Sequence, residues 1–248
     1  MSRRPNSRVR AQSSVVGVAV LLGVVVVSLG TLTASVGTVV EENAATADAT
    51  RVATDLDAAL APVEATGVRR GRVSFTEGRL ETVDRNLRVL NESGVVRTVG
   101  VDALVFTAGD RRVAALAGAV VRGTGANARL RTPPPVTASR GDGGPEGVLV
   151  VGAPALNGSG SIAATGGGSA LLRTDVSHAR TDLGTGSYRV AIETTTPAAW
   201  TRHFRERNAT VTTRRFAGDD EPSVVARFPG ERVAYLVVHD MRLEVRGA

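Results

Sequence analysis

The sequence predicts an α+β protein: a long N-terminal hydrophobic helix, serving as a transmembrane or filament-core element, followed by a mainly antiparallel β-rich extracellular domain. Residues 11–40 contain no charged side chain, and an apolar stretch of this length can cross a bilayer. The leader MSRRPNSRVR carries arginines, so the positive-inside rule leaves the C-terminus outside the cell. From residue 67 onward, short β-branched runs are broken by glycine, a pattern typical of strands and turns.

The N-terminal part divides into a basic leader, residues 1–11, and a helix over residues 12–66. The helix is hydrophobic to residue 40 and amphipathic after it. In the amphipathic part, four apolar residues recur at spacings of four, four and three: Val52, Leu56, Leu60 and Val63. This spacing predicts one helix face packed against the outer domain.

Residues 67–248 form the predicted β-rich domain. Two hairpins are expected, one with Glu77-Gly78 as its turn between residues 72–76 and 79–83, the other turning at residues 91–94. Glycine- and proline-rich loops are expected near 131–147 and 157–169. Further strands are expected at 104–106, 112–114, 118–122, 147–151, 188–194, 224–228, 233–239 and 241–245.

A short helix is expected at residues 197–207, where Trp200 and Phe204 lie four apart and so share one face. Runs of strands with a single short helix indicate an antiparallel sandwich or a β-rich roll.

The charge of the chain does not indicate nucleic-acid binding. The net charge is +6, but the leader holds four of the 30 basic residues and no acids, which leaves 26 basic against 24 acidic residues, or +2. The chain has one Trp, two Tyr and five Phe, eight aromatic residues in all. A base-stacking platform needs clustered charge with interleaved aromatic residues, so we expect no nucleic-acid partner.

No motif in the chain indicates catalysis, a metal or a cofactor. Cysteine is absent, which excludes disulfides and thiol nucleophiles. The three histidines, His178, His203 and His239, are too few and too separated in sequence to suggest a zinc site. No Gly-x-Ser-x-Gly elbow follows a predicted strand. We therefore expect a protein that is not an enzyme, with no catalytic, metal or cofactor-binding residues.

Three glycines of the hydrophobic segment recur every seven residues: Gly23, Gly30 and Gly37. A heptad row drifts by only about 20° per repeat, so these glycines lie on nearly one helix face. Small residues on one face allow two helices to approach closely in an apolar medium. The row therefore predicts helix–helix packing, although a lone membrane anchor with a glycine-rich composition would have the same residues.

Residues 10–18 read RAQSSVVGV. This segment resembles the start of haloarchaeal type IV pilins, which typically read RAVSPVIGV, and departs from it at Gln12 and Ser14. The stretches GVVRTVGVDALVFTAGDRRVAALAGAVVRG, RTPPPV and GSYRVAIETTTPAAW are similar to haloarchaeal pilin-like surface proteins, so the resemblance covers most of the chain. It implies a class III signal peptide that a prepilin peptidase cuts after Ala11. Arg10, Ala11 and Gln12 would then be the processing residues.

The resemblance implies a minor or specialised type IV pilin-like structural subunit of a cell-surface filament or pseudopilus. Its partners would be the membrane, the prepilin peptidase, and copies of itself or other pilin-like subunits that pack through the N-terminal helix. The alternative is a single-pass, membrane-anchored envelope protein whose extracellular β-rich domain binds a partner without assembling. Either reading places the protein at the cell membrane or on its surface.

Three Asn-x-Ser/Thr sequons fall in predicted turns or at a helix end, where glycosylation is sterically allowed. Their asparagines are the candidate glycosylation sites: Asn91, Asn157 and Asn208.

Overall fold

The computed structural model describes residues 8–60, 63, 65–139 and 147–247. Side chains are described for all of these except 8–17 and 33–41. The chain separates into two compact units, Met1–Ala44 and Ala45–Ala248. We describe each unit by itself, and the second is called the β domain below.

The predicted α+β class with a membrane-spanning helix is wrong. Strands take 53% of the fully described residues and helices 22%, so the fold is mainly β. Among those residues, no helical stretch combines the length and the hydropathy needed to cross a membrane. The sequence had also indicated too few strands, because segments such as Gly168–Gly186 pair with strands far away in the chain.

The structure has two α-helices, α1 (Arg8–Leu60) and α2 (Pro197–Glu206), and a short 3₁₀ helix, η1 (Gly125–Asn127). The first eight strands are β1 (Gly67–Phe75), β2 (Gly78–Val83), β3 (Asn86–Asn91), β4 (Gly94–Gly100), β5 (Ala103–Ala108), β6 (Arg111–Leu116), β7 (Ala119–Arg122) and β8 (Arg129–Thr132). The others are β9 (Val136–Ala138), β10 (Gly147–Ala155), β11 (Ser161–Ala164), β12 (Gly168–Gly186), β13 (Arg189–Glu193), β14 (Thr210–Arg214), β15 (Ser223–Arg227), β16 (Arg232–Asp240) and β17 (Glu244–Gly247).

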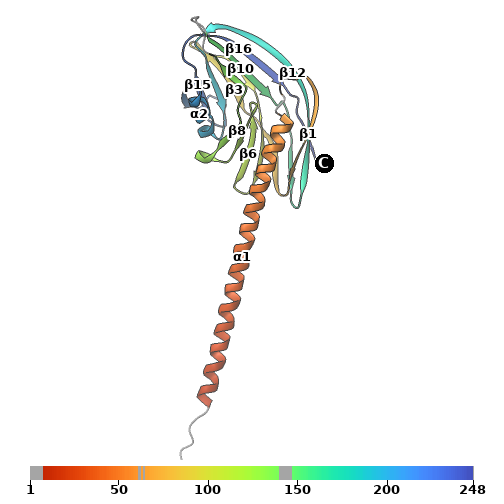
Figure 1. The fold of residues 1–248 in the computed structure, drawn as a ribbon, viewed down its shortest axis with the longest axis vertical. Coiled ribbons are helices and arrows are strands. Elements are labelled where there is room, and N and C mark those ends of the chain that lie inside the picture. Colours follow the sequence, from red (N-terminus) through yellow and green to blue (C-terminus); the bar gives the residue numbers. More distant parts are fainter. Residues whose placement is uncertain (1–7, 61–62, 64, 140–146, 248) are drawn as a thin grey trace, which may run out of the picture. The chain divides into compact units, whose positions relative to one another are not determined.

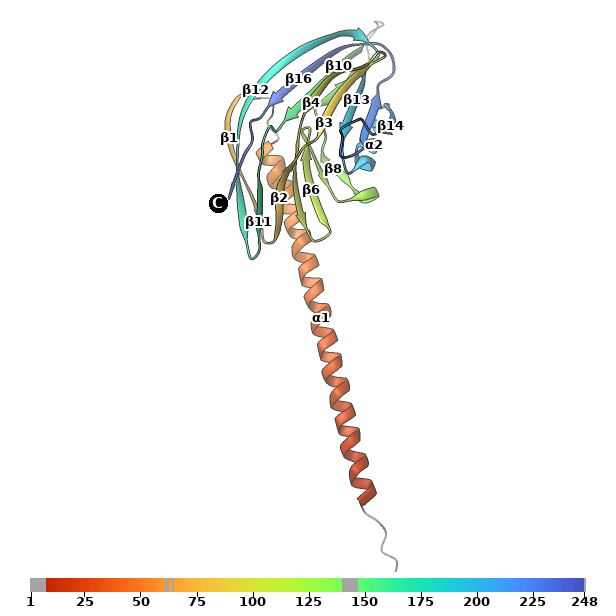
Figure 2. The same ribbon diagram turned by 180° about the vertical axis from the view of Figure 1, so that it is seen from behind.

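The strands form three sheets in the β domain. The first has the order β1-β12-β16-β10-β9, with β17 also paired to β12. The second has the order β11-β2-β5-β6-β7-β8 and the third the order β14-β15-β13-β3-β4. Apart from the parallel pair β10–β16, the pairings between these strands are antiparallel. Figures 1 and 2 show β12 and β16 curving side by side along the domain.

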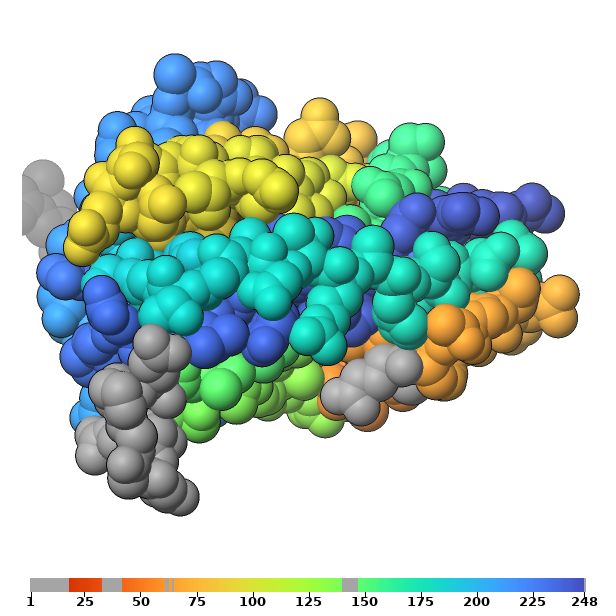
Figure 3. Space-filling view, turned by 90° about the horizontal axis from the view of Figure 1, so that it is seen from above, coloured from red at the N-terminus to blue at the C-terminus, as the bar shows by residue number. Residues whose placement is uncertain are grey.

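Strand β12 is 19 residues long and pairs with different strands of the first sheet along its length. Its first half pairs with β1 over residues 168–176, and its second half pairs with β16 over residues 177–186. Figure 3 shows β12 (cyan) running along one face of the domain next to β1 (orange). This strand was not predicted, because its apolar residues are interrupted by charged and small ones.

The first predicted hairpin is wrong and the second is confirmed. β1 and β2 flank Glu77-Gly78 but do not pair, since β1 pairs with β12 and β2 with β5 and β11. A carboxylate of α1 takes up the turn's backbone donors: Asp48 Oδ2 accepts from Thr76 N at 2.7 Å and from Glu77 N at 3.2 Å. β3 and β4 form the expected antiparallel hairpin, with a bulge at Leu90.

Two hydrophobic cores hold the β domain together. The first joins the third sheet to β10, β16 and α2, and Trp200 and Phe204 are both fully buried in it. Pro197 opens α2, where its missing N–H costs no helical hydrogen bond. The second core packs α1 residues 49–60 onto the first and second sheets. The predicted helix face is confirmed there, because Val52 and Leu56 are fully buried.

Candidate functional site

The first part of α1 exposes apolar side chains in all directions. We call residues 18–32 the apolar helix segment. Leu21 is 68% exposed and Val27 is 66% exposed, although the two positions point about 120° apart around a helix of 100° per residue and so face different sides. The other large apolar side chains exposed here are Val18, Val20, Leu22, Val24, Val25, Val26, Leu29 and Leu32. Full burial of one such side chain is worth about 1.5–3 kcal/mol, so the segment favours an apolar partner.

The glycines of the apolar helix segment leave room for such a partner. A Cβ placed on Gly23 or Gly30 meets no atom within 4 Å. The Thr31 hydroxyl donates to the Ser28 carbonyl oxygen at 2.9 Å, so the helix itself satisfies this polar group. Gly37 lies outside the residues with described side chains, and the packing predicted for the glycine row stays a prediction.

The processing residues predicted from the sequence are not tested by the structure. Arg10, Ala11 and Gln12 fall within the bounds of α1, but their side chains lie outside the described part of the chain. Their role in leader cleavage stays a prediction.

The second part of α1 is held on the β domain by three aspartates. Asp48, only 2% exposed, caps the β1–β2 turn as described above. Asp55 Oδ2 accepts from the Ser74 backbone N at 3.1 Å, and Asp57 Oδ1 accepts from the Thr132 hydroxyl at 2.6 Å. Hydrogen bonds to ionised acceptors are about twice as strong as neutral ones. These contacts therefore fix how residues 45–60 are turned about the helix axis and where they lie along it relative to the sheets. The apolar spacing of this helix alone did not indicate these contacts.

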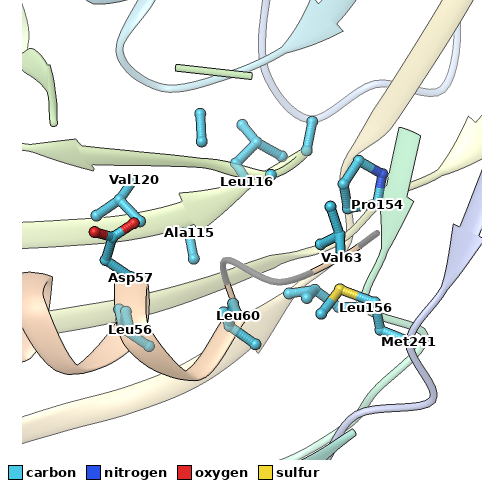
Figure 4. A pocket seen from close by; sticks show the side chains of 13 residues that line it. Leu56, Asp57, Leu60, Val63, Ala115, Leu116, Val120, Pro154, Leu156 and Met241 are labelled. Atoms are coloured by element: carbon cyan, nitrogen blue, oxygen red, sulfur yellow. The ribbon is translucent and has the colours of Figure 1, made fainter. Parts of the chain in front are cut away.

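The cavity beside this helix is too small for a ligand. It lies between α1 and β6, β7 and β10, and its walls include Leu56, Leu60, Val63, Leu116 and Met241 (Figure 4). Its volume is about 20 Å³, room for about one water molecule. Among the described residues of the lining, Asp57 is the only charged one, so the cavity is a packing gap.

A larger, acid-lined pocket of about 370 Å³ lies where β2 and β13 end and β3 begins. Behind it is a buried polar network. Glu193, 1% exposed, accepts from the Asn86 backbone N and side-chain Nδ2, both at 3.1 Å. Arg88 forms a bidentate pair with Asp219, with distances of 2.8 and 2.5 Å. These pairs tie the third sheet to the 216–221 loop, so the charges of this network are matched within the fold.

Asp102 at the edge of this pocket has an unusual environment. Its φ is +45°, which an aspartate adopts more readily than most residues. Burial raises its pKa, and the nearby charge of Asp84 raises the pKa further, while backbone hydrogen bonds from Gly158 and Asn157 act in the opposite direction. Perturbed carboxyl groups often mark functional sites. However, no cluster of three or more Asp, Glu or His residues able to hold a metal occurs among the described residues.

The structure brings two of the three histidines together, which sequence spacing did not predict. The antiparallel register of β12 and β16 sets His178 opposite His239, with their Nδ1 atoms 2.9 Å apart and their rings edge to face. They are 61 residues apart in the chain, so their contact could be predicted only from the pairing of β12 with β16. The pair forms a cross-strand hydrogen bond between imidazoles. His203 lies apart from them, buried in α2.

Comparison with known proteins identifies the family. The model of a family of unknown function, DUF7289, matches residues 10–244. The chain belongs to the DUF7289 family. No curated protein and no solved structure matches it. The DUF7289 match spans both the apolar helix segment and the β domain, so both parts are features of the family's sequence pattern.

The candidate glycosylation sites of this DUF7289 chain differ in exposure. Asn208 is exposed just after α2 with a φ of +60°. Asn157 is also exposed, but its Nδ2 donates to Asp240 Oδ1 at 2.8 Å. Asn91 is half-buried, and its Oδ1 accepts from the Ser93 backbone N at 2.9 Å. The geometry therefore favours Asn208 as an acceptor, and use of any of the three stays a prediction.

Proposed function

We propose that this protein is a pilin-like structural subunit of a cell-surface filament or pseudopilus. A prepilin peptidase removes the leader after Ala11, and the apolar helix segment then packs against the same segment of other subunits. The β domain is the part that the assembly displays.

The observation that carries this proposal is the exposure of the apolar helix segment. Leu21 and Val27 are both more than 60% exposed and point about 120° apart around the helix, so a single flat contact would not cover both fully. A bundle of helices surrounds each member on several sides and covers both. Open space at Gly23 and Gly30 suits this arrangement, because small residues let helix backbones approach closely.

The β domain supports a structural role in a second way. The buried charges of Arg88 and Asp219 neutralise each other within the fold. Its three sheets bury two continuous cores. Such a domain remains folded while the helix carries the assembly contacts.

N-terminal sequencing of the protein isolated from cells tests the proposal. We expect the mature chain to begin at Gln12. An Ala11→Trp variant should keep the full leader, because the junction requires a small residue, while Ala19→Trp, the same change inside the apolar helix segment, should still be cleaved. An intact leader in the wild type, or cleavage beyond Gly37, would contradict the proposal and favour a non-assembling envelope protein.

A further inference from the structure

Three arginines converge on a pocket at the C-terminal end of α2. The pocket has a volume of about 320 Å³. Arg202 comes from α2, Arg207 directly follows it, and Arg129 begins β8. Glu206 and His203 also line the pocket. With His203 neutral, three arginines against one glutamate give this arginine pocket a formal charge of +2.

Backbone carbonyls, and no carboxylates, hold the first two guanidinium groups. Arg129 Nη1 donates to the carbonyl oxygens of Ala126 and Ala128, both at 2.9 Å. Arg202 donates to the same two oxygens, from Nη1 to Ala128 at 3.2 Å and from Nη2 to Ala126 at 3.5 Å. Two like charges therefore share one pair of acceptors, an arrangement that an anion would stabilise.

The third guanidinium is held by the helix. Arg207 Nη1 lies 2.9 Å from His203 Nδ1 and also donates to the His203 carbonyl oxygen at 3.4 Å. The favourable field of a helix C-terminus accounts for a cation at Arg207. It does not account for Arg129 and Arg202, which bind carbonyls of the η1 segment.

The arginine pocket has many donors left for a ligand. A guanidinium has five N–H donors, and two on each of the three arginines are used in the bonds above, leaving three on each. Eight other arginines form ion pairs within 4 Å of a carboxylate in the described chain. Arg129, Arg202 and Arg207 form none among those residues, and Glu206 is not paired with them.

His203 lines the same pocket and is in contact with Arg207. Its side chain is 7% exposed. Because Nδ1 accepts from Arg207, which has no lone pair to offer, the proton of the neutral ring lies on Nε2. Nε2 is buried and has no hydrogen-bond partner in the described part of the chain. Burial, and then the charge of Arg207, lowers the pKa of His203 to about 4, so the ring is neutral at pH 7.

We propose that the arginine pocket binds a multivalent oxyanion, a phosphate or sulfate group that is either free or part of an ester. Guanidinium forks match the oxygen spacing of such groups and bind them in bidentate fashion. The carbonyls of Ala126 and Ala128 hold two of the forks in place before the ligand arrives, which lowers the entropy lost on binding. A volume of about 320 Å³ leaves space for the alcohol part of an ester. This proposal does not depend on the proposed function.

The test uses the imidazole NMR signals of the full chain in detergent micelles. The chain has three histidines, so His→Gln variants assign each signal. At pH 7 and constant ionic strength, we expect inorganic phosphate to shift the His203 signal saturably, and chloride not to. Bound phosphate offsets the Arg207 charge, so the pKa of His203 should rise. The signals of His178 and His239 should not move.

Substitutions then locate the binding site. We expect Arg202→Gln and Arg129→Gln each to weaken phosphate binding at least tenfold. Arg97→Gln is the matched control, since this arginine is exposed on β4 and, like Arg129, donates to a neighbouring backbone carbonyl. Unchanged His178 and His239 signals show that each variant is folded. Wild-type affinity in both pocket variants, or equal losses in all three variants, would overturn the proposal.

The choice of anion distinguishes the ligand sources. Tighter binding of methyl phosphate than of inorganic phosphate would support an ester, and the reverse a free anion; both outcomes support the proposal. Acetate binding as tightly as phosphate, or chloride shifting the His203 signal equally, would overturn the assignment to a multivalent oxyanion.

Discussion

Helix α1 has two parts that differ in burial: residues 45–60 are packed on the sheets, whereas residues 18–32 are exposed. Residues 45–60 bury Val52 and Leu56 completely and use Asp48 to cap a turn of the β domain. The apolar helix segment, residues 18–32, has no charged residue and leaves Leu21 and Val27 more than 60% exposed. The first stretch therefore stabilises the fold of a single chain, whereas the second gains free energy only from apolar contacts that the described chain does not provide.

This difference teaches that stability and assembly can be changed separately. A substitution in residues 45–60 should change the free energy of unfolding of the β domain. A substitution in the apolar helix segment should change contacts between subunits and leave the domain intact.

The largest effect is expected from Gly30→Leu. A side chain at this position meets nothing within the described chain, but it would separate two helices that approach each other at the glycine row. We expect filament yield from cells to fall more than tenfold, with an unchanged melting temperature of the β domain. Val25→Leu, which adds bulk on another side of the helix, is the control. Normal filament yield from Gly30→Leu would remove the close-packing argument.

Asp48→Ala should instead lower the stability of the β domain. It removes the acceptor for Thr76 N, Thr76 Oγ1 and Glu77 N, and we expect a loss of about 2–3 kcal/mol in the free energy of unfolding. Denaturant unfolding of the full chain measures this loss. Arg51→Ala is the control, because its ion pair with Asp48 is 3.9 Å long and more than half exposed on the arginine side; it should cost less than about 1 kcal/mol. Equal losses in the two variants would contradict the capping role.

Gly71→Ala tests how closely α1 packs on β1. A Cβ at Gly71 would overlap the Cβ of Ala59, and overpacking of this kind costs about 1–3 kcal/mol. We expect about 2 kcal/mol of destabilisation, measured by thermal unfolding. Adding Ala59→Gly removes the overlap and should recover part of the loss, although the glycine itself costs the helix about 1 kcal/mol. Additive losses in the double variant would contradict the close contact.

Apart from these ranked substitutions, we expect a pH dependence of stability from His203. The pKa of this histidine is about 4 in the folded chain, against an ordinary value of 6.5. The unfolded chain therefore binds the extra proton first, and stability falls as the pH drops from about 6.5 to about 4, by up to about 1.4 kcal/mol per pH unit. Asp102, with its raised pKa, acts in the other direction.

Comparing wild type with His203→Gln isolates this contribution. We expect the wild type to lose stability relative to His203→Gln on acidification over pH 6.5–4. Above pH 7 the difference in free energy of unfolding between the two chains should be constant. Parallel stability curves for the two chains over that range would contradict the role of His203.

Much of the fold could be predicted where local pattern decides it. Strand β13 alternates, the β3–β4 hairpin has a glycine turn, and Trp200 and Phe204 share a face of α2; all three are found. The β1–β2 hairpin was wrong because a distant carboxylate, Asp48, takes the turn's donors. Strand β12 was missed because its pairing with β16 depends on residues about 60 positions away.

The polar sites were less predictable than the fold. His178 and His239 meet only through the register of two long strands, and the arginine pocket combines β8 with α2, about 70 residues apart. The spacing of neighbouring residues in the sequence does not predict contacts between such distant positions. The arginines of that pocket also look like any others in a chain whose basic residues are all arginine.

Disulfide crosslinking on intact cells tests the proposed assembly most directly. The chain has no cysteine, so Val27→Cys and Leu21→Cys each introduce a single thiol. Val27 lies between Gly23 and Gly30 on their face of the helix, and Leu21 lies on the opposite face; their exposures, 66% and 68%, are matched. We predict more efficient crosslinking between subunits for Val27→Cys than for Leu21→Cys, because helix backbones approach most closely at the glycine face and the other contacts of the bundle are wider. Equal crosslinking of the two variants, or none in either, would contradict assembly through the glycine face.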